Sequence, residues 1–263
     1  MSVDETDLME FLAQDKETEV IAVYAEGVRN GRKFFEAAKK ITQHKPVIVI
    51  KGGLSDAGSK ATASHTGSLA GSAQVFEAVM KQTGLIHAHT MEELFDFARV
   101  LASEPLPKGK HVQIITNGGG YGVLTTDAIS FNQLQLAQMQ EKYRKPIIAA
   151  SPSYAVIKNP MDLTGDADNK RFMVALENAL NDTMVDSIIL IMLFQVPTLD
   201  SDIIEGVSGL LRKRKKPVLV MSVGGEFAQM HMHLLEKEGI NTFSEPQNIS
   251  RAMSALTQYG MKR

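Results

Sequence analysis

A small-residue-rich segment around one histidine is the part of the chain whose residues could do chemistry. Residues 55–72 consist mostly of Gly, Ser, Thr and Ala around His65. The backbone N–H groups of such a segment can approach an anion closely, and the helix expected from Ala73 adds partial positive charge at its start. We interpret His65 as a candidate phosphoryl carrier, with Thr66 and Gly67 as candidate phosphate donors. A solvated histidine without a chemical role is the alternative.

Glu26 is the candidate partner of that histidine. A nucleophilic imidazole needs a carboxylate that fixes its tautomer. Glu26 follows the strand expected over 20–24, so it lies at a carboxyl end of a strand, the edge at which doubly wound sheets bind ligands.

A glycine-rich turn forms a second candidate site. The strand expected over 112–116 leads into Asn117, Gly118, Gly119 and Gly120. This turn matches neither the dinucleotide fingerprint nor the Walker A loop. We predict that Gly118–Gly120 bind phosphate; the alternative is a tight turn that binds no ligand. We interpret the turn-rich segment 159–167 mainly as structure, and the remaining histidines predict no metal site.

Composition limits the class of protein. The 263 residues are 44% hydrophobic and 22% charged, as in soluble globular proteins, and the formal net charge is -2. Neither a nucleic acid nor a membrane is therefore an expected partner, and we interpret the basic run 211–216 as a solvated helix end. The apolar run 187–194 is too short to span a bilayer. Cysteine is absent and no signal peptide is evident, so we expect a cytoplasmic protein.

The order of the expected elements predicts the fold. Strand-like and helical segments alternate along the chain, which indicates an α/β fold with parallel sheets. The segment 105–109 contains two prolines and a glycine, and we predict a domain boundary there. The expected domains are 1–105 and 110–263. Besides 20–24 and 112–116, the expected strands are 47–50, 187–193 and 218–222.

The two domains repeat one plan. Lys45–Gly53 and Gly84 in the first domain correspond to Lys216–Gly225 and Gly239 in the second. Gly53 and Gly84 are 31 positions apart, whereas Gly225 and Gly239 are 14 apart. The excess is the His65 segment, which we predict to be a long loop. The second domain opens with a strand–turn–helix unit that the first one lacks, so we interpret the chain as a fragment or split subunit.

At four places the sequence resembles the NDP-forming acyl-CoA synthetases. These are the ADP-forming acetyl-CoA synthetases, and they are related to succinyl-CoA synthetase. The resemblance rests on four segments: Ser-His-Thr-Gly-Ser-Leu-Ala-Gly at 64–71, Tyr-Ala-Glu-Gly at 24–27, Asn-Gly-Gly-Gly at 117–120 and Asn-Pro-Met-Asp-Leu-Thr-Gly-Asp-Ala at 159–167. It covers essentially the whole chain. It implies two flavodoxin-like domains, the first without its initial βα unit.

The resemblance also implies roles for the candidate residues. His65 would carry phosphate between an acyl phosphate and ADP, with Glu26 as its supporting carboxylate. The backbone of Thr66, Gly67 and Gly118–Gly120 would hold the phosphate. The reaction of the complete enzyme would be acyl-CoA + ADP + Pi ⇌ carboxylate + CoA + ATP.

Cofactors and partners follow from the same resemblance. CoA, ATP or ADP, and Mg²⁺ serve the complete enzyme, and phosphate is what this chain itself would hold. A CoA-binding domain and an ATP-grasp domain or subunit are the expected partners, so we expect the chain alone to be inactive. The alternatives are a non-catalytic regulatory module of a protein acetyltransferase and a piece that only joins subunits. A homo-oligomer, the acyl group and the nucleotide preference stay open.

Overall fold

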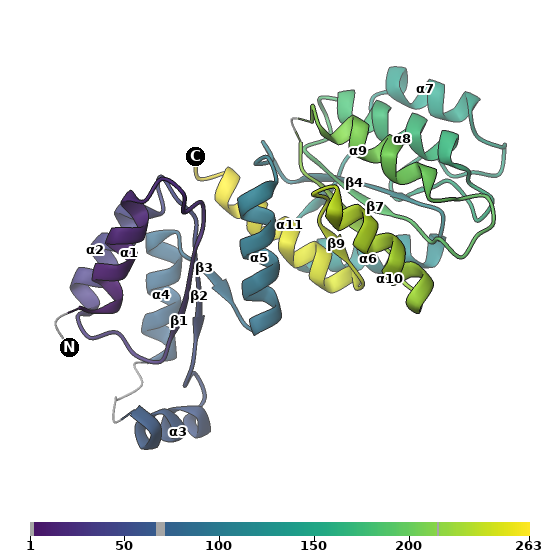
Figure 1. The fold of residues 1–263 in the computed structure, drawn as a ribbon. Helices are drawn as coiled ribbons and strands as arrows, with labels where there is room; N and C mark the ends of the chain where they lie inside the picture. Colours follow the sequence, from purple (N-terminus) through teal and green to yellow (C-terminus); the bar gives the residue numbers. More distant parts are fainter. Residues whose placement is uncertain (1–2, 67–71, 215) are drawn as a thin grey trace. The chain divides into compact units, whose positions relative to one another are not determined.

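The computed structural model describes residues 3–66, 72–214 and 216–263. The chain divides into two compact units, residues 1–102 with 262–263 and residues 103–261. We call them unit 1 and unit 2. Each unit is a parallel β-sheet covered by helices (Figure 1), which confirms the predicted α/β class.

The described residues of unit 1 form a three-stranded sheet in the order β1-β2-β3, with all strands parallel. Ile21 pairs with Val47 at the start of β1, and Ala25 pairs with Lys51 at its end. The chain after β1 and the chain after β2 therefore emerge at the same edge. The strands are β1 (Ile21–Ala25), β2 (Val47–Lys51) and β3 (Ile86–Ala88).

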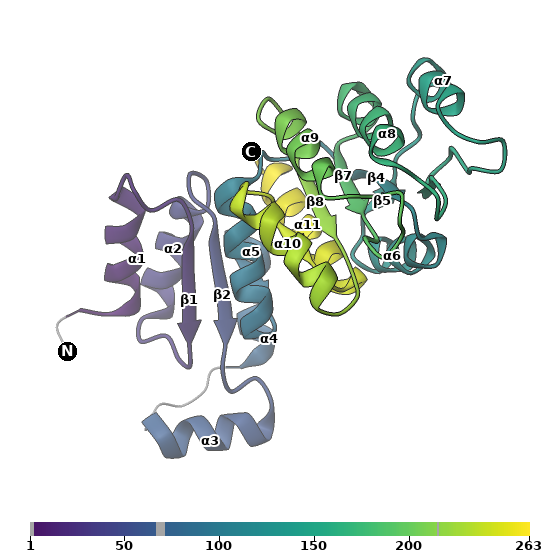
Figure 2. The same ribbon diagram turned by 45° about the vertical axis from the view of Figure 1, so that its right-hand side comes forward.

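Amphipathic helices cover both faces of this sheet. One core cluster joins Val47 and Val49 of β2 to apolar residues of α1, α2 and α4, among them Phe34 and Met80. In Figures 1 and 2, α5 lies on the opposite side of the sheet from α1 and α2. The helices are α1 (Glu5–Gln14), α2 (Gly31–Ile41), α4 (Ala73–Thr83) and α5 (Met91–Ser103).

Unit 2 contains a larger parallel sheet in the order β5-β4-β7-β8-β9, and β6 also pairs with β4. Both faces of β7 are buried along its whole length, which explains its continuous apolar sequence. The strands are β4 (His111–Thr116), β5 (Gln135–Leu136), β6 (Met161–Asp162), β7 (Ser187–Ile191), β8 (Val218–Met221) and β9 (Thr242–Phe243).

Two helical layers enclose the unit 2 sheet. Figures 1 and 2 show α8 and α9 on one side of it and α6 and α11 on the other. Ile188 and Leu190 of β7 join a cluster with residues of α7, α8, α9 and α10. The helices are α6 (Gly119–Phe131), α7 (Glu141–Ala149), α8 (Asn169–Asn181), α9 (Asp202–Leu211), α10 (Glu226–Lys237) and α11 (Pro246–Gly260).

The predicted repeat is present in the structure. The order β1-α2-β2-α4-β3-α5 in unit 1 matches β7-α9-β8-α10-β9-α11 in unit 2, and each set of strands pairs in the same order. Gly84 after α4 and Gly239 after α10 both have positive φ, +81° and +75°, and each ends its helix in the left-handed conformation that favours glycine. The unit formed by β4 and α6 has no counterpart among the described residues of unit 1.

The structure corrects two expectations. Residues 56–66 form helix α3 (Asp56–Thr66) rather than a loop. The basic run 211–216 is not a solvated helix end throughout, because Arg214 forms a 2.7 Å ion pair with the buried Glu104 and Lys216 donates to the carbonyl oxygen of Ala179 at 3.3 Å. Within the described ranges, no helix is long and apolar enough to cross a bilayer.

Candidate active site

In unit 1 the candidate site lies where β1 and β2 end. Glu26 directly follows β1, as the sequence predicted. The Tyr24 hydroxyl donates to Oε1 of Glu26 at 3.0 Å. Oε2 of Glu26 is buried and has no hydrogen-bond partner among the described residues. One carboxylate oxygen is thus held in place, and the other can still accept a hydrogen bond.

Lys51 supports the same edge from β2. It is buried, and its ammonium donates to the carbonyl oxygens of Glu26, at 2.7 Å, and of Gly52. Burial lowers the pKa of Lys51, and the Glu26 carboxylate opposes that shift. The hydrogen bond to Glu26 raises the pKa of Tyr24, because ionising the phenol would remove the proton that the carboxylate accepts.

A close approach of backbone to side chain explains Gly52. A Cβ atom at Gly52 would lie 3.2 Å from the Tyr24 hydroxyl oxygen and 3.4 Å from Cγ of Glu26. The next residue, Gly53, has φ +75°, a conformation that side chains rarely adopt. These two glycines let the chain turn away from β2 beside the Glu26 carboxylate.

His65 lies near the carboxyl end of α3. The helix begins after Ser55, whose Oγ accepts the Gly58 N–H at 3.1 Å, and it projects beyond the ends of β1 and β2 (Figure 2). Its described side chains are half-buried or exposed apart from Thr62, which is buried. The backbone of His65 and Thr66 is described as helical, but their side chains and the whole of Gly67 lie outside the described residues.

In unit 2 the candidate site is the turn between β4 and α6. Thr116 Oγ1 accepts the Gly118 N–H at 2.9 Å and donates to the Gly118 carbonyl oxygen at 3.1 Å. The Asn117 amide pairs with the backbone of Leu193, donating to its carbonyl at 3.1 Å and accepting its N–H at 2.8 Å. These bonds fix the turn to the end of β7.

The first amides of α6 are placed to bind an anion. Gly119 and Gly120 are the first two residues of that helix, and such amides have no acceptor within a helix. No side chain caps this helix start, and its first turn holds no acidic residue. The positive end of the helix dipole therefore has no counter-charge from its own first turn. The Gly118 amide, by contrast, is already bound by Thr116.

Two of the three glycines in this turn are closely approached by other side chains. A Cβ atom at Gly118 would lie 2.3 Å from Cδ1 of Leu193, and one at Gly119 would lie 2.4 Å from Oδ2 of Asp162. Nothing lies within 4 Å of a Cβ atom at Gly120. Asp162 belongs to the segment that we interpreted mainly as a structural turn, and its Oδ1 accepts the Thr164 N–H at 2.9 Å.

The sequence therefore placed Glu26 and the glycine turn at the ends of strands, but it missed the residues that support them. Tyr24 and Lys51 position Glu26, and Thr116 shapes the glycine turn. A lysine at the end of an otherwise apolar strand was the available signal for Lys51. His231 is structural: it is buried, its Nδ1 lies 2.8 Å from the Phe227 carbonyl oxygen, and its ring stacks on Phe194.

Comparisons with known proteins match this architecture. The model of a succinyl-CoA ligase like flavodoxin domain matches residues 1–101, and the model of a ligase-CoA domain matches residues 112–257. These two matches place the chain among the CoA-ligase-like proteins. The chain belongs to the succinyl-CoA ligase-like family of CoA ligases.

Relatives of stated activity cover nearly the whole chain. The chain is 42% identical over 262 residues to the α subunit of ADP-forming acetate–CoA ligase II of Pyrococcus furiosus, across 97% of this chain and 57% of that subunit. It is 34% identical to the ADP-forming 4-hydroxybutyrate–CoA ligase of Nitrosopumilus maritimus, of which it covers 37%. This chain thus spans little more than half of the first relative and less of the second.

A solved structure has the same fold. The dinucleotide forming acetyl-coenzyme A synthetase 1 of Ca. Korarchaeum cryptofilum, in complex with phosphate and ADP, superposes with a TM-score of 0.93 at 34% identity. The alignment covers 99% of this chain and 57% of that one.

Proposed function

We propose that this chain is part of an ADP-forming acyl-CoA synthetase and that His65 carries phosphate between an acyl phosphate and ADP. The relatives are ADP-forming CoA ligases, which supports the reaction class. The observation that carries the proposal is the Glu26 carboxylate, which has one oxygen bound by Tyr24 and a buried, unpartnered second oxygen. Such an oxygen suits an imidazole N–H.

The proposed step is a reversible phosphoryl transfer. One ring nitrogen of His65 attacks the phosphorus of the acyl phosphate; the N–P bond forms, the P–O bond to the acyl group breaks, and the carboxylate leaves. Glu26 accepts the hydrogen bond of the other ring nitrogen and stabilises the positive charge that the ring gains. A terminal oxygen of ADP then attacks the same phosphorus, the N–P bond breaks, and ATP and the neutral imidazole result.

The backbone would hold the phosphate during these steps. Gly119 and Gly120 supply amides at the uncapped start of α6, where a phosphate is stabilised by hydrogen bonds and by the helix dipole. Gly118 contributes by its small size, because its own amide is bound by Thr116. In unit 1 we assign the donor role to the Gly67 backbone; Thr66 is the last residue of α3, where amides are bonded within the helix, so it is a weaker candidate than the sequence predicted.

The remaining cofactors belong to the complete enzyme. CoA supplies the thiol that becomes the thioester, and we assign its binding to the CoA-binding domain expected from the family. ADP with Mg²⁺ is assigned to the ATP-grasp partner. Phosphate is the group that the residues of this chain fit, because the amides at the start of α6 have no side-chain cap.

Radiolabelling in the assembled ligase tests the proposal. With labelled acetyl phosphate or ATP, we expect label on this chain that is lost in acid and retained in base, as a phosphoramidate is. His65→Asn abolishes the label. His44→Asn is the matched control, because His44 is an exposed histidine of the same unit, and it keeps the label. Label that survives in His65→Asn contradicts the proposal.

A further inference from the structure

A cavity lies on the lateral edge of the unit 2 sheet, where β6 follows β5 as the neighbour of β4. β5 pairs with His111 and Val112, and β6 pairs with Ile115 and Thr116 on the same side of β4. Asn159 bridges the step between them. Its Oδ1 accepts the Ile114 N–H at 3.1 Å, and its Nδ2 donates to the Val112 and Ala137 carbonyl oxygens at 2.8 and 3.0 Å.

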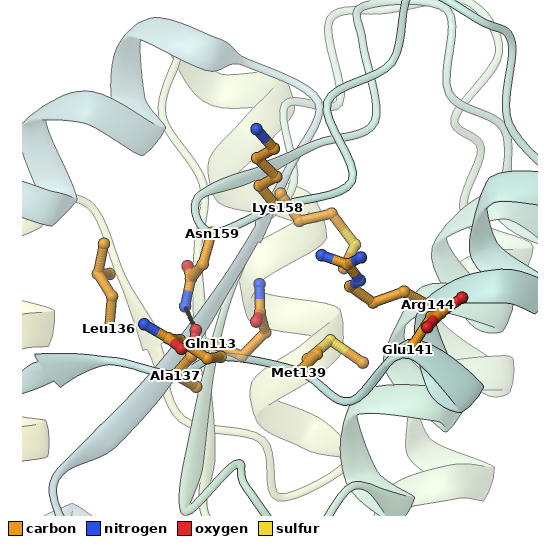
Figure 3. Close-up of a pocket in the computed structure, with 10 residues that line it drawn as sticks. Gln113, Leu136, Ala137, Met139, Glu141, Arg144, Lys158 and Asn159 are labelled. Carbon is orange, nitrogen blue, oxygen red and sulfur yellow. Dashed lines mark hydrogen bonds between the residues drawn. The ribbon is translucent and has the colours of Figure 1, made fainter.

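The cavity beside this step has a volume of about 440 Å³, a size typical of small-molecule sites. Two cationic side chains line it, Arg144 from α7 and Lys158 from the loop before β6 (Figure 3). Glu141 also lines it, but its carboxylate pairs with Lys145 at 3.1 Å and points away from the Arg144 guanidinium. Arg144 and Lys158 are therefore the charged lining residues that form no ion pair with a described residue.

The two cations lack partners in the described part of the chain. Nε of Arg144 is buried and has no hydrogen-bond partner there, and Lys158 forms no ion pair with a described residue. A neighbouring depression of about 460 Å³ shares Arg144 and Lys158, and Ser151 in its wall has a buried Oγ without a partner. Buried donors of this kind are normally satisfied, so acceptor oxygens are what the site lacks.

We propose that this cavity binds a small anion whose phosphate or carboxylate oxygens are held by Arg144 and Lys158. The guanidinium offers several N–H groups in a plane, which suits the paired oxygens of either group. Lys158 adds a second positive charge. Leu136 and Met139 supply the apolar part of the wall. The site is separate from the glycine turn that holds phosphate in the proposed function.

Methionine-methyl NMR on the assembled ligase tests this proposal. Met139 lines the cavity, and Met253 is buried in α11 outside it. We expect titration with inorganic phosphate, or in a second arm with acetate, to shift the Met139 methyl signal and to leave that of Met253 in place. A response to phosphate alone assigns a phosphate ligand, and a response to acetate alone assigns a carboxylate ligand.

Charge-removing variants locate the binding. Arg144→Gln and Lys158→Gln should each lower the affinity for the anion about tenfold or more, since each removes a charge-assisted contact. Lys142→Gln is the matched control: like Arg144→Gln it removes one positive charge from α7, but Lys142 lines neither cavity. Lys158 is exposed, so its variant is expected to fold even if the Arg144 variant does not.

Two results would overturn the proposal. One is a Met139 signal that does not move with either anion; the other is equal affinity for the anion in Lys158→Gln and Lys142→Gln. His65 phosphorylation, measured in the same variants, is expected to stay at the wild-type level. Failure of the cavity proposal is thus distinguishable from failure of the proposed function.

Discussion

At the edge of the unit 1 sheet, two side chains hold Glu26 in a fixed orientation. Tyr24 is an exposed residue, yet its hydroxyl fixes one oxygen of Glu26 at 3.0 Å, while Lys51 fixes the Glu26 backbone carbonyl at 2.7 Å. The carboxylate is oriented before any imidazole reaches it. Leaving a buried carboxylate oxygen without a donor costs stability, and the proposed hydrogen bond from His65 would offset that cost.

Replacing the Glu26 carboxylate should slow phosphorylation without abolishing it. In Glu26→Gln we expect the rate at which His65 is labelled to fall about ten- to hundredfold, because the ring loses the anion that orients it and stabilises its charge. In Tyr24→Phe the labelling rate should fall less, since the Glu26 carboxylate stays charged. Rapid-quench labelling measures both rates. Glu36→Gln, an exposed glutamate of α2, is the control, and an unchanged rate in Glu26→Gln would rule out the supporting role.

His87 should make unit 1 sensitive to acid. Its Nε2 is buried without a partner in the described residues, its ring packs edge-on against Phe76, and burial, with a smaller effect of His89, lowers its pKa below the ordinary 6.5. The unfolded chain therefore binds a proton at a pH where the folded chain does not, so stability decreases as pH falls below 6.5.

The matching experiment compares unfolding free energies by chemical denaturation at about pH 7.5 and about pH 5.5. The loss between the two values should be smaller in His87→Phe than in the wild type. His44→Gln, which changes an exposed histidine of the same unit, should keep the full loss. Equal pH dependence in the wild type and His87→Phe would show that the ring is not held neutral.

Among the secondary structure elements, those with strong apolar patterns could be predicted and α3 could not. The strands expected over 47–50 and 112–116 agree with β2 and β4 to within a residue at each end, because buried parallel strands leave a continuous apolar run. The segment 56–66 has no apolar stripe. Its alanines favour a helix locally, but periodicity gave no sign of it.

In the candidate site, too, some features could be predicted from the sequence and others could not. Glu26 and the glycine turn follow strands, so their place at a sheet edge could be predicted from chain order alone. The hydrogen bond from Thr116 to the Gly118 amide could not, because it depends on a side-chain rotamer in the turn. The same holds for the approach of Leu193 to Gly118, which joins residues far apart in the chain.

Alanine substitutions should distinguish the three glycines of this turn. Gly118→Ala and Gly119→Ala push aside Leu193 and Asp162, and each should destabilise unit 2 by about 1 kcal/mol. Gly120→Ala has open space and a helical position, so it should be neutral or stabilising by up to about 1 kcal/mol. Thermal unfolding measures this order. A Gly120→Ala variant as unstable as Gly119→Ala would contradict the described turn.

At the scale of the whole molecule, each unit has its own hydrophobic core, so we expect two unfolding transitions. Glu104 in unit 2 is buried and accepts hydrogen bonds from Arg214 at 2.7 Å, from the Asn241 amide at 2.8 Å and from the Val218 N–H at 3.2 Å. Burial raises the pKa of Glu104, and Arg214 opposes that shift.

Removing the Glu104 carboxylate should affect one transition only. Glu104→Ala leaves the guanidinium of Arg214 without its partner and should cost unit 2 about 3–5 kcal/mol, while the transition of unit 1 keeps its midpoint. Glu141→Ala removes an exposed ion-pair partner in the same unit and should cost about 1 kcal/mol or less. Scanning calorimetry measures the unfolding transitions of the two units separately. Equal shifts of both transitions would contradict independent cores.

The most direct test of the phosphoryl-carrier assignment is to identify the modified residue in the ligase during turnover. Mass spectrometry of the assembled protein, quenched in base after addition of an acyl phosphate or ATP, should find one phosphoryl group on this chain, on the imidazole of His65. Phosphate on a different side chain, or turnover with His65 unmodified at every time point, would contradict the account.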